Sequence, residues 1–378
     1  MRDDLTRAVL AREDVARYLR GEAGRGGDDV EGRIRSYLDE LRTTQRYSFY
    51  RALKHPLYPI LRKIARHAEH VDLVTRATAA GRVVYVSNHK SHTDYLVELL
   101  VLDENGVRPP VIAAGINLFG GPLGLLHKHV TGAIPIRRNT KDPVYLTTLR
   151  AYIAEMLRRR DLFFYLEGGR SYSGELKAPK TGLLHAALLA QDASPVVIPT
   201  AVAYDLVLED HMLSRQALKR SSRPFAREVA EMVRYAVGYQ SRAFVTFGEP
   251  IQLRQYDPNS RRDALALAHD IRTRIGLLYK VLPTALLATA MRPWATRHEL
   301  EERVEALIAT LRPMGANLGV ETGREAVEQG TEALVGRHVL VVERGGRYRV
   351  RDRVVLRYYA RTIQHLFAAP TDRHSRTH

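Results

Sequence analysis

Residues 86–95 read VSNHKSHTDY and place two histidines, a lysine and an aspartate directly after an apolar segment. The preceding residues 82–86, RVVYV, are β-branched and aromatic, which is the composition of a buried strand. The following residues 95–100, YLVELL, have the apolar spacing of a helix packed on a sheet. The polar cluster is therefore predicted at a strand-to-helix turn, where α/β proteins commonly place their chemistry.

The same alternation of strand and helix signals covers residues 71–255. The pattern predicts an α/β fold with a mixed, mostly parallel sheet flanked by helices, and with helical extensions at both ends. We expect three parts, at residues 1–70, 71–255 and 256–378. Short apolar runs predict strands at 82–87, 111–115, 133–136, 162–166, 196–203 and 243–248, and helical spacing is clearest at 142–160 and 181–191.

The N-terminal part, residues 1–70, is expected to be helical and basic. Helical periodicity covers residues 3–20 and about 30–68. Residues 42–67 contain seven Lys or Arg and no acidic residue, with aromatic and leucine side chains interleaved. Such an amphipathic segment suits an anionic membrane surface, and the alternative is a packed helical subdomain with a solvated basic face.

The C-terminal part is expected to be mainly helical, with one short β-hairpin. The hairpin is predicted in HVLVVERGGRYRV, residues 338–350, with Gly345 and Gly346 at its turn. A last helix is predicted in VVLRYYARTIQHLF, residues 354–367. Helices, hairpin and an arginine-rich end together have the outline of a winged helix, so a basic nucleic-acid-binding protein is an alternative of another class.

The composition restricts the chemistry further. The chain has 378 residues and a formal charge of +16, with a pI near 10.0, so its field attracts phosphates on lipid, nucleic acid or a nucleotide-bearing cofactor. It has no cysteine, which excludes disulfides, thiolate nucleophiles and cysteine zinc sites. The longest uncharged run, residues 109–126, contains three prolines and four glycines, so we interpret it as strand, loop and helix start.

His89 and Asp94 are candidate catalytic residues. Five residues on an ideal helix rotate by about 500°, so the two side chains meet only if His89 lies on the loop and Asp94 in the first helical turn. A carboxylate bonded to one imidazole nitrogen leaves the other nitrogen free as a base. GRSYS, residues 169–173, lacks the last glycine of G-x-S-x-G, so the proton would come from a substrate hydroxyl. Alternatives are an aspartate that stabilises the helix dipole, or a metal site with His92.

Residues 163–182, FFYLEGGRSYSGELKAPKTG, suit an anionic ligand. Glycines let backbone N–H groups approach a ligand, Arg170 offers a bidentate contact, and Lys177 and Lys180 add positive charge. Glu167 can accept a hydrogen bond from a substrate hydroxyl. The segment matches neither common nucleotide-binding pattern, and a tight turn without a ligand is the alternative.

Two other strand segments carry weaker signals. TGAIPIRRN, residues 131–139, delivers Arg137 and Arg138 at a strand end, where paired arginines either bind a phosphate or are simply solvated. In SPVVIPTAVAYD, residues 194–205, Pro199 lies inside an apolar strand, which predicts an edge strand or a bulge.

The order of these motifs resembles the glycerolipid acyltransferase superfamily. N-H-x4-D after a strand is followed by G-x-I-P-I-R-R, then E-G-G-R-S, then V-I-P-T. HKSHTDY, GAIPIRR and EGGRSYSG followed by PKTG resemble more narrowly the glycerol-3-phosphate acyltransferase family, which includes dihydroxyacetone-phosphate acyltransferases. The resemblance covers about residues 40–250 well. It departs from the family at Tyr172, where Arg or Lys is expected, and at Pro135, where an aromatic residue is more usual.

The resemblance implies transfer of a fatty acyl group from acyl-CoA or an acyl carrier protein to the 1-hydroxyl of glycerol 3-phosphate, giving lysophosphatidate. His89 would be the general base and Asp94 would orient it, with no acyl-enzyme. The residues implied in substrate binding are Arg137, Arg138, Glu167, Gly168, Gly169, Arg170, Ser171, Lys180 and Pro199.

The resemblance also implies partners and a location. No metal or bound organic cofactor is expected, and no nucleic acid. The protein is expected at the cytoplasmic side of the cell membrane, held peripherally on an anionic surface. Dihydroxyacetone phosphate, lysophosphatidate or another alcohol is the alternative acceptor.

Overall fold

The computed structural model describes residues 2–23, 29–43, 64–116, 132–219 and 241–367. An eight-stranded sheet forms its centre, in the order β1-β7-β6-β2-β5-β3-β4, with β8 paired to β6. Five strand pairs are parallel, and only the pairs of β6 with β7 and β8 are antiparallel. The predicted mixed, mostly parallel sheet is confirmed. The strands are β1 (Ile64–Glu69), β2 (Val83–Ser87), β3 (Val111–Gly115), β4 (Ile134–Ile136), β5 (Leu162–Tyr165), β6 (Val196–Tyr204), β7 (Ser241–Phe247) and β8 (Ile251–Gln252).

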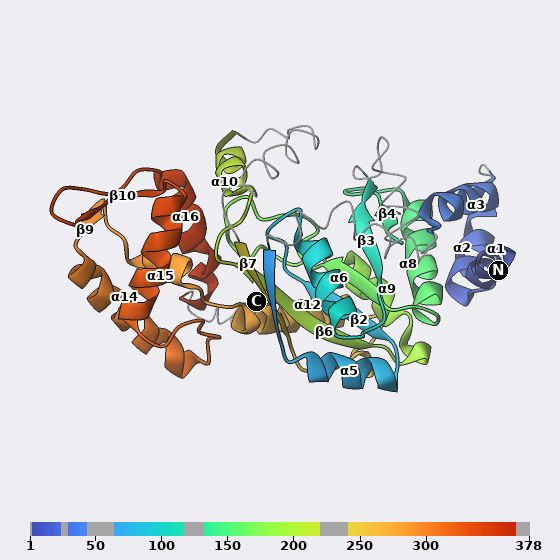
Figure 1. Ribbon diagram of the computed structural model, residues 1–378. Coiled ribbons are helices and arrows are strands. Elements are labelled where there is room, and N and C mark those ends of the chain that lie inside the picture. Colours follow the sequence, from blue (N-terminus) through green and yellow to red (C-terminus); the bar gives the residue numbers. More distant parts are fainter. Residues whose placement is uncertain (1, 24–28, 44–63, 117–131, 220–240, 368–378) are drawn as a thin grey trace, which may run out of the picture.

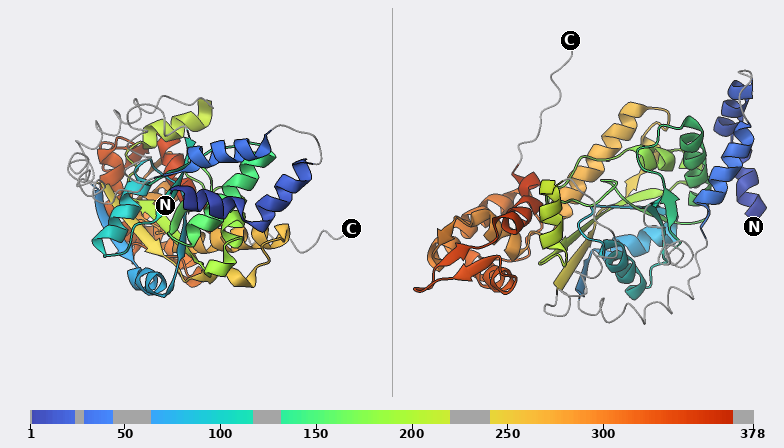
Figure 2. Two further views of the ribbon diagram at one scale, coloured as in Figure 1. Left: turned by 90° about the vertical axis from the view of Figure 1, so that its right-hand side faces the viewer. Right: turned by 90° about the horizontal axis from the view of Figure 1, so that it is seen from above.

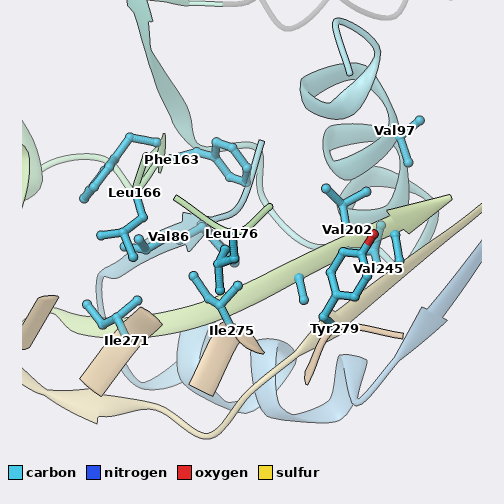
Figure 3. Packing of buried hydrophobic residues seen from close by; sticks show 14 of the residues in the cluster. Val86, Val97, Phe163, Leu166, Leu176, Val202, Val245, Ile271, Ile275 and Tyr279 are labelled. Atoms are coloured by element: carbon cyan, nitrogen blue, oxygen red, sulfur yellow. The ribbon is translucent and has the colours of Figure 1, made fainter. Parts of the chain in front are cut away.

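Helices cover both faces of this sheet, as the view from above in Figure 2 shows. All five residues of β2 are buried, because the strand has a neighbour on each side and helices above and below it. Figure 3 shows Val97 from one helical layer and Ile271 and Ile275 from the other, packed against opposite faces of the sheet. The covering helices are α5 (Val71–Ala80), α6 (Asp94–Glu104), α8 (Pro143–Leu157), α9 (Gly182–Leu188) and α12 (Arg261–Leu278).

The N-terminal helices lie at one end of the molecule (Figure 1). The segment predicted as one helix over residues 3–20 forms two, α1 (Arg2–Leu10) and α2 (Glu13–Ala23), and α3 (Val30–Leu41) follows. Residues 44–63, which make up most of the predicted basic amphipathic segment, lie outside the described residues. The helix start predicted within residues 109–126 falls outside them as well.

The structure corrects the predicted start of the sheet. Residues 64–68 were expected to be helical, but they belong to β1, which pairs in parallel with β7. β1 is an edge strand in which only Ile64 is fully buried, so it lacks the apolar run that marks the interior strands. His67 of β1 stacks on Phe244 of β7 with ring centroids 4.8 Å apart. The α/β part therefore includes residue 64 and does not begin at residue 71.

Of the two predictions for Pro199, the edge strand is wrong, because β6 lies inside the sheet between β7 and β2. The bulge is confirmed on the neighbouring segment, where residues 248–250 lie opposite Ile198 and Pro199. Proline fits there since the neighbouring strand changes at this point. β8 pairs with Val196 and Val197, whereas β7 pairs from Thr200 onward. Gly248, in the gap between the two strands, donates its N–H to the Pro199 oxygen at 2.8 Å. The missing proline N–H faces this interruption, so no strand hydrogen bond is lost.

Residues 283–362 form a separate group of helices with a small antiparallel sheet, in the order β10-β11-β9. The predicted boundary at residue 256 is too early, because α12 covers the central sheet. The predicted hairpin is present, with φ of 88° at Gly345 and 77° at Gly346 in its turn. The two-residue strand β9 carries no signal in the sequence. Helix, strand, two helices and hairpin, with β11 in the middle of the sheet, have the topology of a winged helix. These elements are α13 (Pro283–Ala290), β9 (Trp294–Ala295), α14 (Arg297–Leu311), α15 (Gly323–Gly336), β10 (Leu340–Val342) and β11 (Tyr348–Val350).

The last helix, α16 (Arg353–Thr362), joins this module to the α/β part. Asp210, the first residue of α10 (Asp210–Lys219), accepts hydrogen bonds from the Tyr359 hydroxyl at 2.6 Å and from the Arg337 guanidinium at 2.7 Å. All three side chains are buried, so breaking the pair would leave an uncompensated charge in the interface. Among the described residues, no helix is long and apolar enough to cross a bilayer.

Gly174 offers a test of this packing, with Gly345 as its control. Their φ angles are 87° and 88°, so alanine costs about 1–2 kcal/mol of backbone strain at either position. A Cβ at Gly345 meets no atom within 4 Å, whereas a Cβ at Gly174 overlaps the backbone oxygen of Tyr358 in α16. We expect Gly174→Ala to cost about 1–3 kcal/mol more. Thermal midpoints measured by circular dichroism check this, and equal midpoints would contradict it.

Candidate active site

The polar loop after β2 is organised around the buried carboxylate of Asp94. Asp94 is the first residue of α6, as the spacing argument required, and its side chain is fully buried. Its Oδ2 accepts hydrogen bonds from the backbone N–H groups of Lys90 at 2.6 Å and Ser91 at 2.9 Å, and bonds His89 Nδ1 at 2.8 Å. Its Oδ1 accepts a hydrogen bond from the Tyr204 hydroxyl at 2.8 Å. The carboxylate therefore shapes the whole turn as well as the histidine.

His89 is held as a neutral imidazole with one nitrogen free. Because Asp94 accepts at Nδ1, the hydrogen sits on Nδ1 and Nε2 carries the lone pair. Burial lowers the pKa of His89 to about 4; the Asp94 contact partly offsets this effect, and Arg170 and His92 add to it. The side chain is 14% exposed, so Nε2 is the nitrogen available to a ligand.

A second buried carboxylate lies behind His89. The imidazole stacks on Tyr165, with ring centroids 3.9 Å apart and planes 6° apart. The Tyr165 hydroxyl donates to Glu98 Oε2 at 3.0 Å, and Ser87 Oγ donates to Glu98 Oε1 at 2.5 Å. Burial, and then the charge of Asp94, raise the pKa of Glu98 well above its ordinary value. Sequence analysis missed Glu98, although a glutamate within the apolar pattern of residues 95–100 was a signal.

The loop after β5 pairs with the loop after β2 through its backbone. Ser171 N–H donates to the His89 oxygen at 2.9 Å, and Ser171 Oγ donates to the Glu175 oxygen at 2.6 Å. Glu167 is buried, and its two oxygens accept from the N–H groups of His89 at 3.2 Å and Lys177 at 3.3 Å. Burial raises the pKa of Glu167, an effect partly offset by the neighbouring Lys90. Both oxygens of Glu167 thus brace the loops.

Arg138 and Arg170 come together beside the two glycines of this loop. A Cβ on Gly169 would lie 3.5 Å from Arg138 Nη1, and a Cβ on Gly168 would lie 3.2 Å from Lys180 Cγ, so both basic side chains pass close to the glycines. Desolvation and the charge of Arg170 lower the pKa of Arg138. Arg170 also lowers the pKa of His89, so its positive charge acts on the imidazole as well. These cations can hold an anion at the loop after β5.

Arg137 does not join this cluster, although it was predicted as a binding residue. Its guanidinium forms a bidentate pair with Glu40 of α3, at 2.8 and 2.5 Å, and lies over the rings of Tyr37 and Tyr145. Both arginines follow the last residue of β4, and the chain bends at Arg138, so their side chains reach different surroundings. Pro199, which was also predicted to contact a substrate, lies inside β6 opposite Val86, three residues before His89.

Lys90 and Glu209 are two further buried groups that sequence analysis did not single out. Lys90 is 1% exposed, its Nζ donates to the Gly174 oxygen at 2.6 Å, and burial lowers its pKa. Glu209 accepts from Ser91 Oγ at 2.9 Å and from His92 N–H at 2.7 Å. The residues that complete the turn are distant in sequence, so no local pattern predicts them.

The cluster contains no evident metal centre. Among the described residues, no group of three or more His, Asp or Glu side chains could hold a metal ion. Two open hollows lie around Gly81 and Arg82, at the N-terminal end of β2, and their linings include none of the residues of the polar cluster.

Comparisons with known proteins bear on the class of the protein. Residues 54–203 match the family model "Acyltransferase", so the part that carries the cluster is an acyltransferase domain. Residues 228–371 match the model "Glycerol-3-phosphate acyltransferase C-terminal region". The chain belongs to the glycerol-3-phosphate acyltransferase family, as its motifs predicted.

Curated relatives extend beyond this chain. Glycerol-3-phosphate acyltransferases of Pasteurella multocida and Aeromonas hydrophila are each 30% identical, over 88% and 98% of this chain and 46% and 50% of their own lengths. The enzyme of Actinobacillus succinogenes is 35% identical over 58% of this chain. The chain thus spans about half the length of the curated relatives it matches. A solved 1-acyl-sn-glycerophosphate acyltransferase of Thermotoga maritima is 15% identical with a TM-score of 0.36, over 72% of this chain and 95% of that chain.

The protonation of His89 can be tested directly. We expect its imidazole to titrate near pH 4, because burial disfavours the cation more than Asp94 favours it. The unfolded chain protonates histidine near pH 6.5, so His89 reduces folding stability as the pH falls from about 6.5 to 4. Nitrogen-15 NMR of labelled histidines gives the midpoint. Loss of the signal in His89→Gln assigns it, and a midpoint near 6.5 would contradict the expectation.

Proposed function

We propose that this protein transfers a fatty acyl group from a thioester to the 1-hydroxyl of glycerol 3-phosphate. The products are lysophosphatidate and a free thiol, and the donor is acyl-CoA or an acyl carrier protein. The observation that carries the proposal is His89, whose Nδ1 is bonded to Asp94 and whose loop is bonded, through Ser171 N–H, to the loop that carries Arg170. The names of the curated relatives support the same acceptor.

In the proposed mechanism His89 acts as a general base. Nε2 takes the proton of the acceptor hydroxyl as its oxygen attacks the thioester carbonyl carbon, forming a tetrahedral intermediate. The carbon–sulfur bond then breaks, and the thiolate takes the proton back from the imidazolium. Asp94 stabilises the imidazolium and keeps the ring in place, which supports a base contribution of about 10²–10⁴-fold. Alignment of the two substrates supplies much of the remaining rate enhancement.

The acceptor phosphate is assigned to the cations around the loop after β5. Arg138 and Arg170 supply guanidinium donors, and Lys180 passes over Gly168. Glycines at 168 and 169 let the acceptor approach the backbone. Glu167 and Ser171 contribute by holding the loop against His89, and Arg137 by holding β4 to α3. The proposed chemistry uses no metal and no bound organic cofactor.

The proposed site of action is the cytoplasmic side of the cell membrane, with peripheral attachment to anionic lipid. The +16 charge of the chain and the lipid nature of donor and product support this location. Dihydroxyacetone phosphate and lysophosphatidate carry the same phosphate group as glycerol 3-phosphate, so phosphate binding alone does not distinguish the acceptors. All three compounds must be compared as acceptors.

Thiol release from palmitoyl-CoA tests the reaction. We expect release that depends on glycerol 3-phosphate and exceeds the release with dihydroxyacetone phosphate or lysophosphatidate. His89→Ala should lower turnover by at least about 10²-fold, because it removes the base. His298→Ala, on the exposed surface of α14, is the matched control and should leave turnover unchanged. Near-normal turnover in a folded His89→Ala protein would contradict the proposed general-base mechanism.

Variants of the two adjacent arginines distinguish the residue proposed to bind phosphate from the residue that supports the structure. We expect Arg138→Gln to raise KM for glycerol 3-phosphate by about 10–100-fold, because it removes a charge-assisted hydrogen bond to the phosphate. Arg137→Gln breaks the contact with Glu40 and should mainly lower the thermal midpoint, with a smaller change in KM. Steady-state kinetics of both variants give KM, and thermal melts give their midpoints. Equal KM values would contradict the assignment of Arg138.

A further inference from the structure

The small C-terminal sheet has an outer face centred on an exposed tryptophan. Cross-strand partners share one face of a sheet, and the pairs Trp294–Arg349 and Val341–Arg349 place these three residues together. Trp294 is 55% exposed, and the Arg347 guanidinium lies 5.6 Å from its ring centroid. We call these four residues and the adjoining Arg344 and Arg351 the wing face.

The charge of this region is strongly positive. Glu343, the acidic residue of the hairpin, is already paired with Arg349 at 2.6 Å. Val342, at the end of β10, is also exposed, at 56%, but it pairs with Tyr348 and so lies on the other face of the sheet. The wing face itself combines an indole with several cations on one short hairpin and its neighbour strand. The exposed arginines here are Arg292, Arg344, Arg347, Arg349, Arg351 and Arg353.

Many proteins with a winged-helix topology bind DNA, but the surface charge of α15 disfavours DNA binding here. In DNA-binding modules of this kind the last helix before the hairpin enters the major groove. The exposed stripe of α15 consists of Arg324, Glu328 and Glu332, which carries a net negative charge. Phosphates on both sides of the groove would repel this stripe. The basic wing face therefore suits a flat anionic partner better than a groove.

We propose that the wing face binds an anionic phospholipid surface. Tryptophan rings favour the headgroup level of a bilayer, where the apolar ring is covered and the indole N–H stays hydrated. Arginines beside it reach lipid phosphates, and each cation near such a surface strengthens binding about five-fold. The inference rests on the proposed function, since it supplies the membrane contact that a lipid-synthesising acyltransferase needs. It assigns that contact to residues 294 and 341–351 (Figure 1, at the end opposite the N-terminal helices).

The chain offers a built-in reporter, because Trp294 is its single tryptophan. We expect its emission to shift to shorter wavelength when the full chain meets vesicles of phosphatidylglycerol and phosphatidylcholine. Vesicles of phosphatidylcholine alone, and duplex DNA at the same salt, should leave the emission unchanged. Lipids brominated near the headgroup should quench it.

Charge variants test which surface is responsible. Arg344→Gln, Arg347→Gln and Arg351→Gln together should weaken partitioning to anionic vesicles roughly a hundred-fold, by the factor per cation given above. Arg254→Gln, Arg261→Gln and Arg262→Gln remove the same charge from exposed positions elsewhere and should weaken it far less. Trp294→Ser, at an exposed position, should lower flotation with vesicles while leaving the thermal midpoint unchanged.

The outcomes separate this inference from the proposed function. If the protein floats with vesicles but the emission of Trp294 does not shift, another part of the chain contacts the membrane. That result would overturn the inference. An equal loss in both triple variants, or a shift with DNA, would overturn it too. Thiol release with soluble glycerol 3-phosphate and a short-chain acyl-CoA, without vesicles, tests the reaction alone. If no thiol is released, a positive vesicle result still supports lipid binding by the wing face. If thiol is released, a negative vesicle result still contradicts lipid binding by the wing face.

Discussion

The buried carboxylate of Asp94 is the contact on which the rest of the site depends. A fully buried, uncompensated carboxylate costs several kcal/mol, and Asp94 avoids this cost by bonding to two backbone N–H groups, one tyrosine hydroxyl and His89. Those contacts come from the loop after β2 and from Tyr204 at the end of β6. The carboxylate therefore fixes the turn, the start of α6 and the tautomer of His89 at once.

The surroundings of Asp94 keep its charge isolated within the core. Glu98 lies one helical turn further along α6, and burial together with the charge of Asp94 raises its pKa. Its contact with Tyr165 holds the ring on which His89 stacks, so a core residue helps to orient the imidazole. Arg138 lies beside Gly169 of the loop after β5, which also carries Arg170. The proposed base and the proposed phosphate-binding residues thus lie on or beside two loops that are bonded to each other.

The C-terminal module contributes to the site through packing. Gly174 passes so close to Tyr358 of α16 that no side chain fits, and its oxygen accepts a hydrogen bond from the buried Lys90. The loop that carries Arg170 is thus held between the loop after β2 and the last helix. This arrangement explains how a winged-helix module can support an α/β site while its own outer face remains available for contact with another surface.

Local patterns predicted the interior strands and the position of His89 and Asp94 at a strand-to-helix turn, and the order of the motifs indicated the family. Those features are encoded locally, in apolar runs and in motifs of fixed spacing. The sequence alone did not reveal β1, whose partly exposed residues lack an apolar run, nor the interior place of Pro199, which depends on where β7 gives way to β8. Only the tertiary structure separated Arg137 from Arg138 and brought Tyr204 and Glu209 to the site. Such contacts join residues distant in the chain, and a buried charge is satisfied in space, whereas a sequence pattern records only neighbours.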